Sequence, residues 1–127
     1  MTPPSSPLRT SPYWLATAGF FGLTAVAALA AGAHAASGAL AHELILQAGN
    51  LQLFHALLLV TLASNSGRWI GYSRWLITLG ILLFCGSLYT KAFLALEHAP
   101  LAPWGGSFLM LGWLMLIIEG IGKARKA

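Results

Sequence analysis

The sequence predicts an all-α integral membrane protein, a bundle of four transmembrane helices with both termini in the cytoplasm. Apolar residues make up 57% of the 127 residues and charged residues only 8%, whereas a soluble domain carries roughly 25% charged residues. The apolar residues fall into four runs, each long enough to cross a bilayer as a helix. The net charge of +4 comes mostly from basic residues outside these runs, where they act as topology signals rather than as a nucleic-acid surface.

The first twelve residues hold four prolines together with several Ser and Thr residues, a composition that cannot bury enough apolar surface to order itself. We predict that residues 1–12 form a flexible cytoplasmic tail and that residues 13–33 form the first span. An alternative is a cleaved secretory signal, because Arg9 precedes the run and Ala33-His34-Ala35 resembles a cleavage site. Cleavage would leave three spans. We favour the retained span, since the run exceeds the roughly 7 to 15 residues of a signal core.

The second predicted span, residues 44–63, is the least hydrophobic of the four. Gln47, Asn50, Gln52 and His55 lie in its first half. The pattern is also compatible with an amphipathic segment that lies in the outer interface, so two interpretations of this half remain.

The third and fourth predicted spans cover residues 75–96 and 104–121. Two prolines in residues 97–103 predict a turn between antiparallel helices. Residues 122–127 are predicted to form a basic cytoplasmic tail.

The distribution of basic residues predicts the orientation of the bundle. With four spans, the N-terminus, the second loop and the C-terminus share one side, and the other side has only Lys91, near the end of the third span. The positive-inside rule makes the basic side cytoplasmic. That side collects Arg9, Arg68, Arg74, Lys123, Arg125 and Lys126.

Polar residues inside membrane spans are costly and therefore mark candidate sites. Gln52 and His55 are three residues apart on one helix face, and Ser87 and Lys91 are four apart on another. In antiparallel helices, His55 and Lys91 are expected at similar depths. We predict a pocket open to the outside, lined by Gln52, His55, Tyr89 and Lys91, with His34 near its rim. The alternative is that these groups only form hydrogen bonds between helices.

The four histidines do not have the spacing of a metal site, and no Cys-x-x-Cys or His-Glu-x-x-His motif accompanies them. The sequence therefore predicts no metal and no cofactor, although a haem held by His34 and His55 is an alternative. The single cysteine, Cys85, excludes an intramolecular disulfide.

Small residues predict close helix packing. Ala18 and Gly22 are four apart, as are Ala28 and Gly32, which gives two small-xxx-small faces. Glu119 precedes Lys123 by four residues, which favours an ion pair between them. Alternatively, Glu119 points into the bundle from the helix face that also carries Gly105 and Gly112. The packing candidates are Gly22, Gly32, Gly86, Gly105, Gly106 and Gly112.

The motifs resemble those of the domain of unknown function 423 family, also called transmembrane-protein-256-like. Gly32-Ala33-His34 resembles the end of the family's GAFGAH motif, and residues 52–55 resemble its YQxxH stretch. Residues 80–89 resemble its GxxLFSGSLY signature. Residues 103–106 and 112–113 resemble its TPxGG and GW elements. The likeness covers nearly the whole membrane region, with the motifs in the family's order.

The resemblance implies a small inner-membrane protein of several spans whose biochemical function is not established. Cys85 and Ala102 stand where the family carries Ser and Thr, and Leu51 stands where it usually carries Tyr. The resemblance directs attention to His34, Gln52, His55, Ser87, Tyr89, Gly105 and Gly106.

The leading functional hypothesis is a non-enzymatic membrane protein, an accessory or scaffold subunit that joins a larger membrane complex through its helix faces. Short loops, small residues and aromatic residues near the span ends leave little room for a catalytic apparatus. The expected partners are the lipid bilayer and either a larger complex or further copies of the chain, without nucleic acid. The alternatives are a small transporter or channel that uses His55 and Lys91, and a protein that binds haem, quinone or lipid head groups at the outer pocket.

Overall fold

A computed structural model describes residues 9–36 and 38–127, and these residues form four α-helices without a strand. They are α1 (Pro12–Ala35), α2 (Ala39–Ala63), α3 (Arg68–Leu94) and α4 (Ala102–Ala124). Each is long and apolar enough to cross a membrane. The predicted all-α membrane fold is therefore confirmed at this level. Residues 1–8 of the predicted tail lie outside the described residues.

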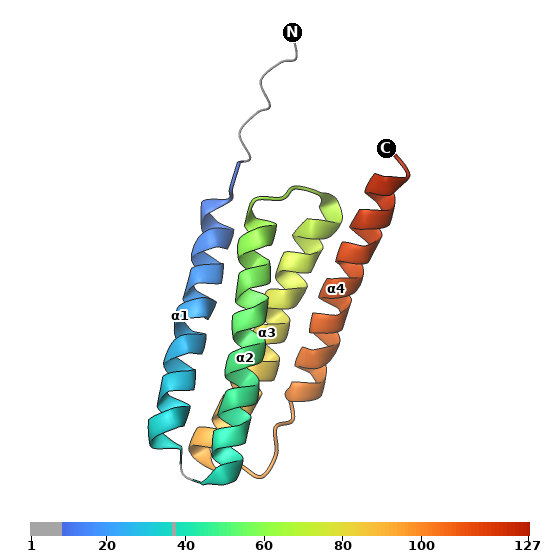
Figure 1. Cartoon of the computed structure of the whole chain (residues 1–127). Coiled ribbons are helices and arrows are strands. Elements are labelled where there is room, and N and C mark those ends of the chain that lie inside the picture. Colours follow the sequence, from blue (N-terminus) through green and yellow to red (C-terminus); the bar gives the residue numbers. More distant parts are fainter. Residues whose placement is uncertain (1–8, 37) are drawn as a thin grey trace.

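Successive helices run antiparallel, so the C-terminus and the start of α1 lie at the same end of the bundle (Figure 1). This end is called the basic end below, because Arg9, Arg68, Lys123, Arg125 and Lys126 lie there. Thr10 and Ser11 are tied to it, since the Ser11 N–H donates to the Ala63 carbonyl at 2.9 Å and the Thr10 and Ser64 hydroxyls are 3.0 Å apart.

Pro and Gly residues set the helix boundaries. Pro12 and Pro103 lie in the first turns of α1 and α4, where a missing N–H costs no helical hydrogen bond. Gly38 precedes α2 with φ of 104°, a conformation that favours glycine. The predicted turn at residues 97–103 is present between Leu94 and Ala102.

The helices extend beyond several of the predicted spans. Helix α2 begins at Ala39 rather than at residue 44, and α3 begins at Arg68 rather than at residue 75. The predicted tail from residue 122 is helical as far as Ala124. Because an α-helix satisfies its backbone hydrogen bonds internally, it can continue past the end of the apolar run into the polar interface.

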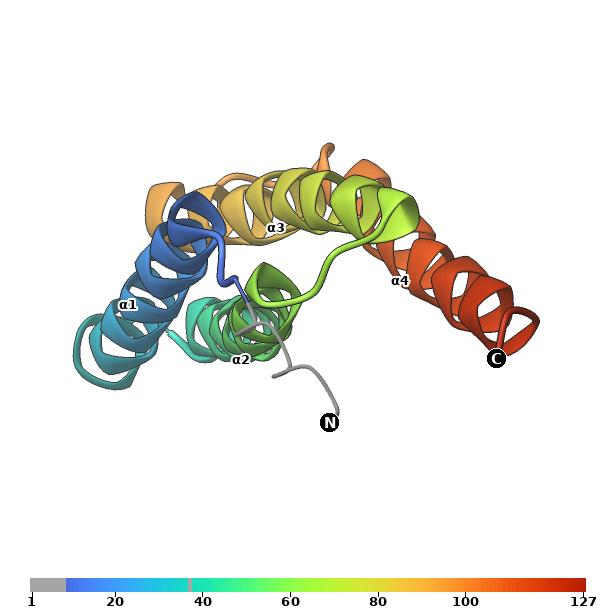
Figure 2. The same ribbon diagram turned by 90° about the horizontal axis from the view of Figure 1, so that it is seen from above.

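The four helices pack in chain order, with α1 and α4 at the two edges of the bundle. Helix α2 packs closely against α1 and α3, and α3 packs closely against α2 and α4. Seen along the bundle, α4 lies at the far side of α3 from α1 (Figure 2). The core lies mostly among α1, α2 and α3, and its largest fully buried apolar side chains are Ile45, Leu59, Ile77 and Ile81.

Glycines bring α4 close to α3. A Cβ at Gly105 would fall on the Phe84 backbone, and one at Gly112 would lie 2.6 Å from Cγ1 of Ile77. The Ser73 hydroxyl also donates to the Gly112 carbonyl at 2.9 Å. The predicted packing role of these two glycines is consistent with this interface.

The other predicted packing glycines differ in their surroundings. A Cβ at Gly32 would meet the Ile45 side chain, whereas one at Gly22 would make an ordinary 4.0 Å contact with Ala56. A Cβ at Gly106 would likewise make an ordinary contact with the Phe84 ring, at 3.8 Å. A Cβ at Gly86 would meet nothing within 4 Å, so Gly86 makes no close helix contact among the residues that the structure describes.

Candidate functional site

Gln52 joins three helices through one side-chain amide. Its Nε2 donates to the Phe21 carbonyl at 2.8 Å and to the Thr24 hydroxyl at 2.7 Å, both on α1. Its Oε1 accepts a hydrogen bond from the Tyr89 hydroxyl on α3 at 2.9 Å. Both amide protons and one lone pair are therefore used inside the bundle. The arrangement fixes α1, α2 and α3 in one register.

A shallow cleft of about 230 Å³ lies beside this amide, and its walls are mostly apolar. The Cys85 thiol on one wall points to α2 and donates to the Ala48 carbonyl at 3.4 Å. The cleft is lined by Phe20, Phe21, Thr24, Gln52, Ile81, Leu82, Cys85, Gly86 and Tyr89. Because the polar groups at its floor already have partners, the cleft offers an incoming ligand mainly apolar contacts.

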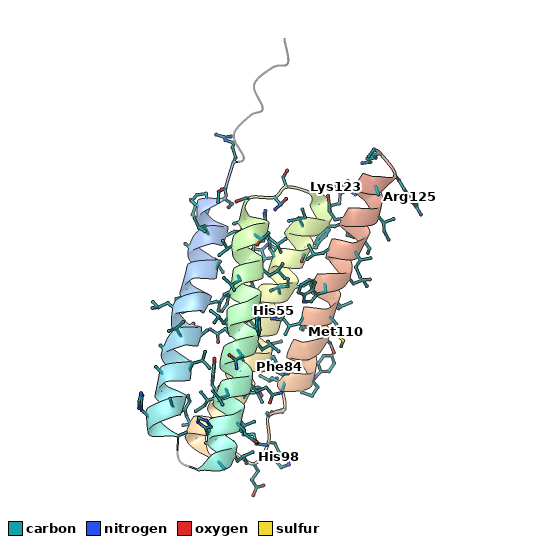
Figure 3. All side chains as sticks on the ribbon, in the orientation of Figure 1. His55, Phe84, His98, Met110, Lys123 and Arg125 are labelled. Carbon is teal, nitrogen blue, oxygen red and sulfur yellow. The ribbon has the colours of Figure 1, made fainter. Side chains whose placement is uncertain are left out.

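His55 makes a separate polar contact, between α2 and α4. Its Nδ1 lies 2.8 Å from the Leu51 carbonyl, so Nδ1 carries the proton of the ring. Its Nε2 then accepts a hydrogen bond from the Trp113 indole N–H at 3.2 Å. The two rings are edge to face with centroids 6.2 Å apart. Figure 3 shows His55 near the middle of the bundle's length.

The remaining predicted pocket residues lie elsewhere. Lys91 lines a cleft of about 190 Å³ near the start of α2, with Leu40 and Leu44. Leu44 precedes His55 by eleven residues, which corresponds to about 16 Å along a helix. His34 is exposed at the end of α1, and Ser87 is buried in α3.

The structure thus brings Gln52 and Tyr89 together and separates them from His55, Lys91 and His34. His55 and Lys91 were predicted at similar depths, but the structure places them at different depths. Lys91 on α3 lies opposite the first turns of α2, and His55 lies further along α2. Within residues 9–36 and 38–127, no three His, Cys, Asp or Glu side chains group closely enough to hold a metal ion.

Glu119 links α4 to the start of α3 at the basic end. Its Oε1 lies 3.4 Å from Lys123 Nζ, as the four-residue spacing predicts. Its Oε2 also accepts a hydrogen bond from the Trp69 backbone N–H at 3.2 Å. A carboxylate is favourable there, because the first N–H groups of a helix have no helical acceptor and carry partial positive charge.

Arg74 performs a similar role for the end of α2. Its Nε donates to the Leu62 carbonyl at 3.1 Å, and its guanidinium also donates to the Asn65 carbonyl. The guanidinium carbon lies 5.7 Å above the Trp14 ring, which joins α1 to the same contact.

Sequence reasoning missed the partners Thr24, Trp113 and Trp69, and the structural use of Arg74. One signal was available, because Trp113 lies in the middle of a span, whereas membrane Trp residues usually lie near the interfaces. The other partners depend on the helix register, which the sequence pattern does not specify.

Comparison with known proteins identifies the relatives of this chain. The family model described as a protein of unknown function (DUF423) matches residues 28–106. The UPF0382 inner membrane protein YgdD of Escherichia coli is 35% identical over 128 residues, covering 92% of this chain and 95% of that protein. A UPF0382 membrane protein of Staphylococcus haemolyticus is 35% identical over 95 residues, covering 69% of this chain and 78% of that protein. No solved structure matches. The family match and the near full-length similarity show that this chain belongs to the DUF423 family of proteins of unknown function.

Proposed function

We infer that the protein is a non-enzymatic accessory or scaffold subunit of the bacterial inner membrane, and that it joins a larger membrane complex through α4. The observation that carries this proposal is the exposure of α4, which lies at one edge of the bundle and has the smallest buried share of the four spans, 17% against 22% for α1. The side of α4 turned away from α3 is then available to a helix of another protein.

The outer face of α4 has the composition of a helix-binding surface. It comprises Met110, Trp113, Leu114, Ile117 and Ile121, each between 44% and 68% exposed. Met110, Leu114, Ile117 and Ile121 recur at helical spacing, opposite Gly105, Leu109 and Gly112, which are buried against α3, and Trp113 lies at the edge of this face toward α2. Two glycines and Leu109 on the face toward α3 anchor α4 to α3, and large apolar side chains on the other face are left exposed.

A polar contact lies beside this face. The hydrogen bond between His55 and Trp113 is exposed and lies at mid-length of the bundle. Both ring nitrogens of His55 and the Trp113 N–H already have partners within the chain, so the pair does not itself require a further hydrogen bond. A partner helix along α4 would cover this pair.

The internal polar groups support a structural role rather than a transport path. The Gln52 amide already has three partners, and the Tyr89 hydroxyl is one of them. His55 contacts Trp113 on α4, whereas Lys91 lines the cleft near the start of α2, so the two do not line one route. A chain of polar groups open to water, which a proton or ion path requires, is not assembled among these side chains.

The proposed location rests on the relatives and on charge. The Escherichia coli relative is named an inner membrane protein. The basic end carries most of the Lys and Arg residues, so the positive-inside rule favours cytoplasmic termini.

Native purification with matched variants tests the proposal. The tagged full chain is extracted in mild detergent from its own host, and the complex is sized by native mass spectrometry. A larger complex is expected, and Met110→Ala with Ile117→Ala is expected to release the chain from it. Leu23→Ala with Val26→Ala, on the exposed face of α1, is the control and should leave the complex intact. Recovery of every variant as the same homo-oligomer would contradict the proposal.

A further inference from the structure

A basic cleft of about 410 Å³ lies between the first turn of α3 and the last turns of α4. Its walls carry Arg68 and Trp69 from α3 and Glu119, Lys123 and Lys126 from the α4 end of the chain. Gly67 and Gly122 also line it, and a Cβ at Gly122 would meet nothing within 4 Å. Figure 3 shows Lys123 and Arg125 at this end.

The cleft has an excess of positive charge that its own carboxylate does not neutralise. Glu119 is occupied by the Trp69 N–H and by Lys123. Within the described ranges 9–36 and 38–127, Arg68 and Lys126 have no carboxylate within ion-pair distance. Two cationic side chains, Arg68 and Lys126, therefore face the cleft without an internal counter-ion. Lys123 adds a third positive charge, which is paired with Glu119.

Aromatic residues place the cleft at the level of lipid head groups. The Trp69 and Tyr72 rings lie 5.9 Å apart on the first turns of α3, and both are exposed. Trp and Tyr are typical of the membrane interface, because their rings are apolar with one polar group. From this level toward the middle of the bundle, the exposed side of α4 is apolar, with Ile117 and Leu114. Lipid phosphates and acyl chains occupy these two levels of a bilayer.

We propose that this cleft binds the phosphate of an anionic phospholipid. The Arg68 guanidinium would donate two parallel hydrogen bonds to the phosphate oxygens, and the Lys126 ammonium would add a point charge. Glu119 orients Lys123 and occupies the N-terminus of α3, so the phosphate is expected between Arg68 and Lys126 rather than on the helix end. Lipid binding at this cleft is independent of the proposed protein partner of α4.

Native mass spectrometry of the full chain, released from detergent with equal amounts of phosphatidylglycerol and phosphatidylcholine, tests the site. Phosphatidylglycerol is expected to be retained preferentially. Arg68→Gln and Lys126→Gln should each lower its apparent affinity about fivefold, the effect of one basic residue near a lipid surface. Arg125→Gln removes the same charge at the same end but outside the cleft lining, and it should change the affinity less than twofold.

Three outcomes would overturn the proposal. An equal loss in Arg125→Gln would show a diffuse attraction of the basic end, and equal retention of the two lipids would show no preference for an anionic head group. Inorganic phosphate that raises the melting temperature as much as phosphatidylglycerol does would assign the cleft to a free anion. Arg68 and Lys126 are exposed, so both variants should keep the melting temperature of the lipid-free protein, which separates lost binding from lost folding.

Discussion

At the scale of single residues, Gln52 joins three helices through one side chain. Its amide takes part in three hydrogen bonds to two other helices while its side chain is buried. In hydrocarbon no water is present to hydrogen-bond to the Gln52 amide in place of a lost partner. We therefore expect the register of α1, α2 and α3 to depend on this side chain.

Replacing Gln52 by Leu should lower the free energy of unfolding by about 2 kcal/mol, because three membrane hydrogen bonds of roughly 0.6 kcal/mol or more each are lost. Unfolding in mixed detergent and sodium dodecyl sulfate measures the change. Gln47→Leu is the matched control, since Gln47 lies on the same helix and is exposed. Equal stability of the two variants would show that the Gln52 amide does not hold the helices together.

The hydrogen bond between His55 and Trp113 is the side-chain contact that joins α2 to α4. A double-mutant cycle with His55→Phe and Trp113→Phe should give a coupling energy of about 0.6 to 1.7 kcal/mol. Both replacements keep an aromatic ring, so most of the packing is retained. Additive effects on the unfolding free energy would mean that the contact contributes nothing.

The sequence could indicate which residues carry polar contacts, but not all of their partners. Gln52 and Tyr89 were expected in one cluster, and the structure bonds them directly. His55 was expected beside Lys91, yet it contacts Trp113. Helical spacing shows which residues share a face of a helix. The depth of a residue in the membrane depends on where its helix begins, and the sequence does not mark that residue clearly when the first turns are polar.

At the scale of elements, the contact between α3 and α4 depends on glycine. Gly80, Gly105 and Gly112 all lie where a Cβ would meet the facing helix, with Leu109, Phe84 and Ile77 respectively. Close approach of backbones strengthens van der Waals contact, which is a main source of helix association in membranes.

Gly105→Ala should therefore destabilise the bundle by about 1 to 3 kcal/mol, because the added methyl group must displace the Phe84 backbone. The neighbouring Gly106→Ala is the control, since its methyl group would lie 3.8 Å from the Phe84 ring. Thermal unfolding in detergent reports both. If Gly106→Ala were the more damaging variant, the placement of this interface would be wrong.

The existence and order of the helices could be predicted from the sequence more reliably than their ends. Apolar run length predicted all four, and the two prolines predicted the last turn. The first turns of α3, from Arg68 to Arg74, were not predicted as part of a span because Arg68, Gly71 and Arg74 make this stretch less apolar. Arg74 is nevertheless used inside the fold, at the end of α2.

At the scale of the whole molecule, the charges are concentrated at one end and the large apolar face of α4 lies on one side. The apolar pattern of each helix showed that the helices face lipid or one another, but not which two helices would lie at the edges. That result depends on α2 and α3 each packing against two neighbours, which leaves α1 and α4 at the edges. The edge position of α4 could therefore not be predicted from its own sequence.

Orientation can be tested by cysteine labelling in whole cells. Glu97→Cys, in the loop opposite the basic end, should react with a membrane-impermeant maleimide from outside. Lys126→Cys should react only after the membrane is opened, because the basic end is expected in the cytoplasm. The natural Cys85 is buried and serves as the unlabelled background. The reverse pattern would invert the proposed topology.

Site-specific photocrosslinking in the native membrane tests the central claim most directly. A photoreactive amino acid is placed at Ile117 on the outer face of α4, and in a second variant at Phe20 on α1, positions that are 58% and 61% exposed. We predict a crosslink from position 117 to one larger membrane protein and none to that protein from position 20. Crosslinks to lipid alone at both positions, or to the same proteins from both, would contradict a docking role for α4.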